Sequence, residues 1–144
     1  DTKLDEEKVR FALEITNTYK HKDKQVAELS GGQKQRVWIA MALAQDTDIL
    51  FLDEPTTYLD IRYQLEILKL IRKLNSEYKM TIIMVLHDIN QALYYSDEIA
   101  AMKDGQIIAK GAPEEVITPQ LIEEVYGVNL KLTRLDGRSY VLAV

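Results

Sequence analysis

Two apolar runs separated by an amphipathic stretch constrain the fold of this chain most strongly. Residues Ile49–Leu52 and Met80–Leu86 are unbroken and apolar, as in strands that a parallel sheet buries on both faces. Between the runs, apolar residues recur at the spacing of one helix face, namely Ile61, Leu65, Leu68, Ile71 and Leu74, and Asp60 is placed to cap that helix. A strand, a helix and a second strand in this order predict an α/β fold with a largely parallel sheet core.

The flanking segments carry local signals for further helices and hairpins. Residues 5–19 are charged and have helical character, with Val9, Leu13 and Thr16 on one face. A short helix is expected over Ile89–Tyr95. Asp-Gly pairs at 104–105 and 136–137 each lie between strand-like segments and predict two hairpins. Thr118-Pro119 predicts the start of a last helix, and Gly127 its end.

The segment Leu29–Gln33, with sequence Leu-Ser-Gly-Gly-Gln, predicts a helix start that is suited to an anion. Ser30 and Gln33 have the spacing of a capping box, and Val37, Ala40, Met41 and Ala44 follow at core spacing. The free N–H groups and positive dipole end of a helix favour negative charge, and two glycines let a ligand approach the backbone closely. A capped helix needs no ligand, however, so this pattern alone favours a purely structural interpretation.

Three ionisable residues follow the two apolar runs. Asp53 and Glu54 end the first, at the strand terminus where α/β sheets bind ligands. Asp53 suits Mg²⁺, which prefers oxygen ligands, and Glu54 suits the orientation or deprotonation of an attacking water. A solvated acidic pair is the alternative. His87 ends the second run and would lie beside Glu54 if the strands are neighbours, although a lone histidine is more often structural. His21 lies in a lysine-rich loop and is expected to be solvent-exposed.

Composition excludes several classes of protein. The 144 residues correspond to one domain or part of one, and 47% hydrophobic residues are enough for a core. The net charge is −5, and the 18 basic residues are scattered among 23 acidic ones, without the basic stripe of a nucleic-acid binder. No cysteine is present for disulfides or thiolate metal sites, and the longest apolar run is too short to span a bilayer. A soluble globular chain is expected.

Together these segments resemble the ATP-binding cassette (ABC) ATPases. Leu29–Gln33 corresponds to their signature, Asp53-Glu54 to the end of Walker B, Thr56–Asp60 to the D-loop and His87 to the switch histidine. None of the six glycines is followed by lysine, so the phosphate-binding loop G-x-x-x-x-G-K-[ST] (Walker A) is missing. The resemblance therefore predicts the C-terminal part of a P-loop NTPase domain that lacks the Walker A half.

The resemblance also predicts three segments within this partial domain. Residues 1–45 would be part of the helical subdomain with the signature helix, residues 46–112 the core with Walker B, D-loop and switch histidine, and residues 113–144 a C-terminal helix and hairpin. The sequence Thr-Thr-Tyr-Leu-Asp at 56–60 is most similar to importer ATPases for iron–siderophore, haem or cobalamin uptake. The stretches 86–92 and 103–116 support the same similarity.

The resemblance implies an ATPase subunit on the cytoplasmic face of a membrane, with ATP and Mg²⁺ as cofactors. Its direct partners would be a second ATPase subunit, in a homodimer, and the permease subunits. A substrate-binding protein would act indirectly, and no nucleic acid is implied. The implied site residues are Glu54 and His87 for catalysis, Asp53 for the metal, and Ser30, Gly31, Gly32, Gln33 and Asp60 for the nucleotide, which the signature reaches across the dimer.

Two alternatives stay open at this point. ABC ATPases of DNA repair or chromosome organisation separate their halves with a long coiled coil, and no sustained heptads precede Leu29. The second alternative is a non-catalytic fragment, and this alternative is compatible with an origin in a longer importer ATPase. Because the phosphate loop supplies most of the phosphate affinity, the isolated chain is expected to bind ATP weakly and not to hydrolyse it.

Overall fold

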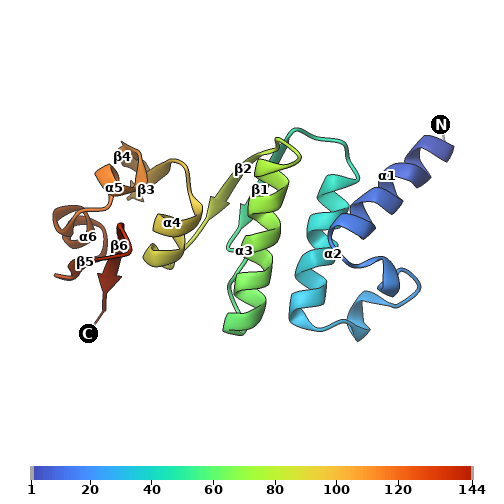
Figure 1. The fold of residues 1–144 in the computed structure, drawn as a ribbon, viewed down its shortest axis with the longest axis horizontal. Helices are drawn as coiled ribbons and strands as arrows, with labels where there is room; N and C mark the ends of the chain where they lie inside the picture. The colour runs from blue at the N-terminus through green and yellow to red at the C-terminus, as the bar shows by residue number, and fades with distance from the viewer. Residues whose placement is uncertain (1, 144) are drawn as a thin grey trace. The chain divides into compact units, whose positions relative to one another are not determined.

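The chain folds into two compact units that meet in sequence between Val85 and Leu86 (Figure 1). The computed structural model describes residues 2–143. Each unit has its own cluster of buried apolar side chains. The three segments expected from the sequence, 1–45, 46–112 and 113–144, remain a prediction about domain organisation.

Unit 1 is an α/β unit built on two parallel strands. In chain order it contains α1 (Thr2–Ile15), the 3-10 turns η1 (Tyr19–His21) and η2 (Val26–Glu28), α2 (Gly31–Leu43), β1 (Ile49–Asp53), α3 (Ile61–Ser76) and β2 (Thr81–Val85). β1 and β2 pair in parallel, in a register that runs from Ile49 opposite Thr81 to Asp53 opposite Val85. The predicted strand–helix–strand order and the α/β fold class are confirmed.

The core of unit 1 lies where α3 and α2 meet one face of this sheet. Its buried members are Ile39, Leu50, Ile67, Leu70, Ile71, Leu74 and Met80, and Leu52, Ile82 and Met84 pack against them. Ile39, Leu68 and Leu74 have no exposed surface. Full burial of such a side chain stabilises a fold by about 1.5–3 kcal/mol, so the later turns of α3 carry much of the stability of this unit.

The prediction that both strands are buried on both faces is wrong. Phe51 is 72% exposed and Ile83 is 51% exposed, and Ile49 and Val85 are exposed as well. Successive side chains of a strand point to opposite faces of a sheet. The helices of unit 1 pack on the face that carries Leu50, so the alternate residues of each strand lie on the other face and remain accessible.

The three apolar stripes predicted from helical spacing are confirmed only in part. Buried as predicted are Leu68, Ile71 and Leu74 on α3, Ala40 on α2, and Thr16 directly after α1. On α3, Ile61 is 76% exposed and Leu65 is also exposed, whereas Ile67 and Leu70 are buried. On α2, Met41 is exposed while its neighbour Ile39 is buried, and on α1 Val9 is exposed while Ala12 is buried. Periodicity identifies apolar positions along a helix, but the packing of α1, α2 and α3 decides which of these positions are buried and which neighbours join them.

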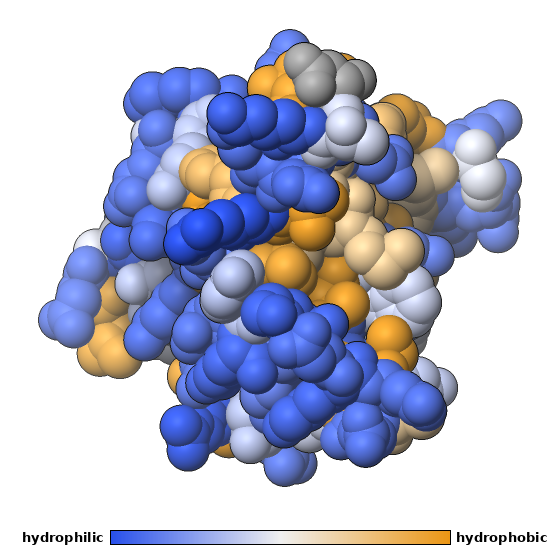
Figure 2. Space-filling view, turned by 90° about the vertical axis from the view of Figure 1, so that its right-hand side faces the viewer, coloured by the Kyte–Doolittle hydropathy of each residue, from blue (hydrophilic) through white to orange (hydrophobic). Residues whose placement is uncertain are grey.

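Figure 2 views the side of the molecule that carries α1, where orange hydrophobic patches lie among mostly hydrophilic side chains. The two helices α1 and α2 expose several large apolar side chains, namely Leu4, Val9, Phe11, Trp38 and Met41. Apolar side chains exposed in number on neighbouring helices are typical of surfaces that contact another protein.

Unit 2 consists of two antiparallel hairpins and three short helices. Its elements are α4 (Ile89–Tyr95), β3 (Ile99–Lys103), β4 (Gln106–Gly111), α5 (Pro113–Val116), α6 (Pro119–Tyr126), β5 (Lys131–Leu135) and β6 (Arg138–Leu142). Both Asp-Gly turns are confirmed, and each has positive φ at both residues, as a type I′ turn requires. The Thr118 cap, which accepts a hydrogen bond from Leu121 N, and the left-handed Gly127 are confirmed too.

Among the described residues, no helix combines the length and the apolar character that crossing a membrane requires.

Candidate functional site

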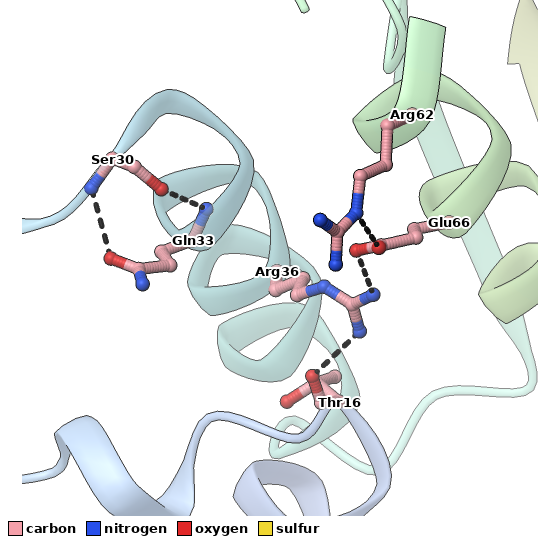
Figure 3. Close-up of polar contacts among 6 residues, drawn as sticks. All are labelled: Thr16, Ser30, Gln33, Arg36, Arg62 and Glu66. Atoms are coloured by element: carbon pink, nitrogen blue, oxygen red, sulfur yellow. Dashed lines mark hydrogen bonds and ion pairs between the residues drawn. The ribbon is translucent and has the colours of Figure 1, made fainter. Parts of the chain in front are cut away.

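The start of α2 has the predicted capping box (Figure 3). Gln33 N donates to Ser30 Oγ at 3.2 Å, and Ser30 N donates to Gln33 Oε1 at 3.0 Å. Within residues 2–143, the N–H groups of Gly31 and Gly32 make no hydrogen bond. The first turn of α2 therefore keeps two backbone donors at its positive dipole end, which is the arrangement that favours an anion.

The two glycines of this turn have different surroundings. A Cβ on Gly32, which is buried, would lie 2.9 Å from Tyr63 Cδ1 on α3, so this position is too close to the ring for a side chain. A Cβ on exposed Gly31 would meet Leu59 Cδ2 at 3.5 Å, an ordinary contact. The small size of Gly32 therefore lets α2 pack closely on α3. That the two glycines serve the approach of a ligand stays a prediction.

These contacts bring the start of α2 beside the segment Leu59–Tyr63. That segment contains Asp60, which stands at the N-cap position of α3 with extended backbone angles. The predicted cap is confirmed in position, but the Asp60 side chain makes no capping hydrogen bond. Within unit 1, then, Ser30–Gln33 and the Thr56–Asp60 segment form one continuous candidate site.

Arg36 on α2 bonds both to α3 and to the residue that directly follows α1 (Figure 3). Its Nη1 donates to the Thr16 carbonyl at 3.1 Å, and its Nη2 pairs with Glu66 Oε2 at 3.2 Å. Arg62 Nε pairs with the other oxygen, Glu66 Oε1, at 3.0 Å. The hydrogen bond from Arg62 lowers the pKa of Glu66, and Arg36 lowers it further.

Asp53 and Glu54 lie at the carboxyl end of β1. Asp53 is the last residue of the strand and is exposed. Glu54 has φ of 51°, a left-handed conformation that non-glycine residues rarely adopt and that is enriched at functional sites. Its Oε2 accepts a hydrogen bond from Thr57 Oγ1 at 3.2 Å, while Thr57 N donates to the Glu54 carbonyl at 3.2 Å. The turn thus fixes the direction of the Glu54 carboxylate.

Tyr58 is the second left-handed residue of this turn. Its φ is 63° and its side chain is fully exposed. Pro55 and Thr56, by contrast, are buried, and Gln64 Nε2 donates to the Leu59 carbonyl at 2.8 Å. The segment is therefore held at both ends, while the Tyr58 side chain projects into solvent.

His87 lies at the start of unit 2. It is exposed and directly precedes Asp88, whose Oδ1 accepts a hydrogen bond from Gln91 N at 3.0 Å and caps α4. β1 and β2 are neighbours, as the prediction for His87 required, and their register ends at the pair Asp53–Val85. The proximity of His87 to Glu54 stays a prediction.

His21 is not the exposed residue that its lysine-rich loop suggested. Both ring nitrogens are inaccessible to solvent and have no hydrogen-bond partner among the described residues. This burial lowers the pKa of His21, and Lys24 and Lys20 lower it further. The prediction is wrong because His21 is half-buried and its ring nitrogens are shielded from solvent, which the polar composition of the loop does not reveal.

No group of three or more His, Cys, Asp or Glu side chains within residues 2–143 is arranged to hold a metal ion. Mg²⁺ bound to a nucleotide is commonly held by one or two carboxylates together with phosphates and waters. The role of Asp53 as its ligand stays a prediction.

Residues 3–57 match the family model described as ABC transporter. The chain is 49% identical over 130 residues to the petrobactin import ATP-binding protein FpuC of Bacillus anthracis, covering 90% of this chain and 48% of that protein. It is 50% identical over 126 residues to the ferric enterobactin transport ATP-binding protein FepC of Escherichia coli, covering 88% and 46% respectively. The chain thus spans about half the length of these curated relatives.

Solved structures agree with these relatives. Part of an ABC transporter complex, cbiO1 from Clostridium perfringens, is 39% identical with a TM-score of 0.72, over 83% of this chain and 47% of that one. The ATP-binding cassette MJ0796, in a dimeric post-hydrolysis state bound to ADP and Pi, is 36% identical with a TM-score of 0.62, over 72% and 44%. The chain therefore belongs to the ABC transporter family of ATP-binding proteins.

Proposed function

We propose that this chain is part of the ATP-hydrolysing subunit of an ABC importer for iron–siderophore type substrates. The observation that carries the proposal is the contact between the capped start of α2, with its unpaired N–H groups, and the segment that follows Asp53-Glu54. The names of the relatives FpuC and FepC, which refer to petrobactin and ferric enterobactin, support the substrate class.

The proposed chemistry assigns one task to each part of the site. Ser30, Gly31, Gly32 and Gln33, with Asp60, bind the phosphates of ATP at the start of α2, where the helix end favours negative charge. In the family this contact reaches ATP that is held by the phosphate loop of a partner subunit, so the signature acts across a homodimer.

Hydrolysis is assigned to the ends of the two strands. Asp53 holds Mg²⁺, which when bound neutralises phosphate charge. Glu54 accepts a proton from the attacking water or orients it, and the Thr57 hydroxyl holds its carboxylate. His87 contacts the γ-phosphate and that water. Each role follows the family resemblance at the matching position.

The proposed partners act at a membrane. The subunit works on its cytoplasmic face, with permease subunits as direct partners and a substrate-binding protein acting through them. The exposed apolar side chains of α1 and α2 offer a surface for such a protein contact. The chain contains no G-x-x-x-x-G-K-[ST] sequence, so alone it binds ATP weakly and does not turn it over.

Uptake in cells tests this function. A bacterial strain without its own ferric-siderophore ATP-binding subunit receives a full-length protein that carries this sequence, together with its permease, and uptake of iron-labelled siderophore is measured. We expect uptake with the unaltered protein and with the exposed control variant Lys69→Gln, and none with Glu54→Gln. Full uptake with Glu54→Gln, or no uptake of any ferric siderophore by the unaltered protein, would contradict the proposal.

A further inference from the structure

The outer edge of strand β6 is covered by side chains rather than by another strand. Within residues 2–143, β6 pairs with β5 and with no other strand. In an antiparallel pair, alternate N–H groups point away from the partner strand. Those of Ser139 and Val141, two residues apart, donate to the side chains of Glu114 and Asn90. This edge, which would otherwise be open to pairing with another chain, is thereby closed by two residues of α5 and α4.

The contact between Asn90 and Val141 has the geometry of strand pairing. Val141 N donates to Asn90 Oδ1 at 2.7 Å, and Asn90 Nδ2 donates to the Val141 carbonyl at 3.1 Å. One amide side chain thus satisfies both backbone groups of a residue that is 51 positions away. Because Val141 is only 7% exposed, loss of these bonds would leave backbone polar groups poorly hydrated.

Two further contacts attach the same hairpin to its surroundings. The guanidinium of Arg138 lies 4.2 Å from the centre of the Tyr94 ring on α4. The Ser139 hydroxyl and amide both donate to the carboxylate of Glu114 on α5. Asn90 is therefore the hairpin contact nearest the start of α4, while Glu114 holds the hairpin to a different helix.

The start of α4 also carries His87. Asp88 caps the helix, Asn90 is its second residue, and His87 lies three residues before Asn90. A helix of seven residues is marginal alone, so its direction depends on tertiary contacts. Ile89 and Leu93 supply apolar contacts to the core of unit 2, and Asn90 supplies directional ones.

We propose that Asn90 is a positioning residue for His87. Its paired hydrogen bonds to β6 fix the first turn of α4, and this turn sets the direction in which the His87 side chain leaves the backbone. The β5–β6 hairpin thereby helps to hold the His87 side chain in one orientation. The consequence for ATP hydrolysis rests on the function proposed above for His87.

The effect of the Asn90 hydrogen bonds on the orientation of His87 is tested in the 144-residue chain, without any ATPase assay. Amide hydrogen exchange in α4 and the NMR signals of the His87 ring are compared among the unaltered chain, Asn90→Leu, Asn90→Asp and Glu114→Gln. We expect both Asn90 variants to speed exchange at Ala92 and to shift the ring signals. Asn90→Asp should do so less, because it keeps the acceptor for Val141 N. Glu114→Gln should affect Ser139 and leave α4 unchanged.

Two outcomes of this comparison would overturn the proposal. One is unchanged exchange in α4 and unchanged His87 signals in both Asn90 variants. The other is global unfolding of unit 2 by both variants, which would make Asn90 a residue of general stability rather than one of position.

A double-mutant cycle in a full-length protein that carries this sequence tests the consequence for hydrolysis. Asn90→Leu should lower kcat about tenfold and leave KM within about twofold, because misplacement of a group affects the reacting geometry more than binding. In a His87→Ala background, Asn90→Leu should have no further effect. If the kcat losses of Asn90→Leu and His87→Ala multiply in the double variant, the positioning role of Asn90 is overturned, and the function proposed for His87 still stands. No effect of His87→Ala would remove the role of His87, and the exchange data would still decide the role of Asn90.

Discussion

Gly32 lies directly beneath the ring of Tyr63, so close that a Cβ there would stand 2.9 Å from Cδ1 and 3.1 Å from Cγ. The contact joins the first turn of α2 to the first turn of α3 and thus sets the spacing between the two parts of the proposed nucleotide site. Gly31, one residue earlier, faces no such restriction.

Substitution of these glycines should therefore have opposite effects on stability. Gly32→Ala forces the Tyr63 ring aside and should destabilise unit 1 by about 1–3 kcal/mol, as overpacking usually does. Gly31→Ala should be neutral or stabilising, by up to about 1 kcal/mol, because alanine favours the helix. Urea unfolding followed by fluorescence of Trp38, the single tryptophan of the chain, measures both. Equal effects of the two substitutions would show that the Tyr63 contact does not restrict Gly32.

In the full-length protein, Glu54→Gln should retain ATP binding and lower hydrolysis by about 10²–10⁴, the usual contribution of a positioned base. Dimers with ATP bound should accumulate, because closure no longer leads to turnover. Steady-state phosphate release and size-exclusion chromatography with ATP check these outcomes, with Lys69→Gln as the surface control. Near-normal turnover would move the base elsewhere, with His87 as the first residue to test.

Attachment of the C-terminal hairpin should weaken in acid. The Ser139 hydroxyl and then the Ser139 amide lower the pKa of Glu114 in the folded chain. A carboxylate with a depressed folded pKa stabilises the fold above its ordinary pKa, and this contribution is lost as the pH falls through the folded value. The NMR shift of the Ser139 amide should therefore move as the pH is lowered from about 5. In Glu114→Gln it should stay nearly constant, and an equal change in both proteins would contradict the assignment.

His21 should make unit 1 less stable as the pH falls. Burial and two nearby lysines lower the pKa of His21, so the folded chain favours the neutral ring. A depressed pKa means that stability is fully present above the ordinary value of 6.5 and declines as the pH falls toward the folded value. Urea midpoints between about pH 7.5 and 5, measured by Trp38 fluorescence, should decline in the unaltered chain and less in His21→Leu. Parallel profiles would exclude His21 as the cause.

The exposed face of the β1–β2 sheet should promote self-association of the 144-residue chain. Phe51 and Ile83 are both more than half exposed, and in the part of the chain that the structure describes no further strand pairs with either edge of this sheet. Sedimentation at increasing concentration should show a larger average mass for the unaltered chain than for Phe51→Lys. The matched substitution Tyr58→Lys, at an exposed aromatic residue outside the sheet, should change this mass little. A chain that stays monomeric at high concentration would contradict the expectation.

Local signals in the sequence determined much of this structure. The capping box of Ser30 and Gln33, the two Asp-Gly hairpin turns and the Thr118 cap occur where they were predicted, because each depends on residues within one turn of the chain. The order of strands and helices followed from apolar periodicity, and the motifs in the sequence indicated the family that the comparisons then matched.

Tertiary structure alone decided which surfaces are covered and which distant residues pair. The apolar run of β1 is unbroken and gives no sign of which face the helices cover, so the exposure of Phe51 became visible only in the packed unit. The inward ring of His21 and the contact of Gly32 with Tyr63 depend on segments that meet only after folding. Asn90 pairs with Val141 across 51 residues, a separation at which the sequence holds no local pattern, because such a contact exists only once α4 and β6 have packed together.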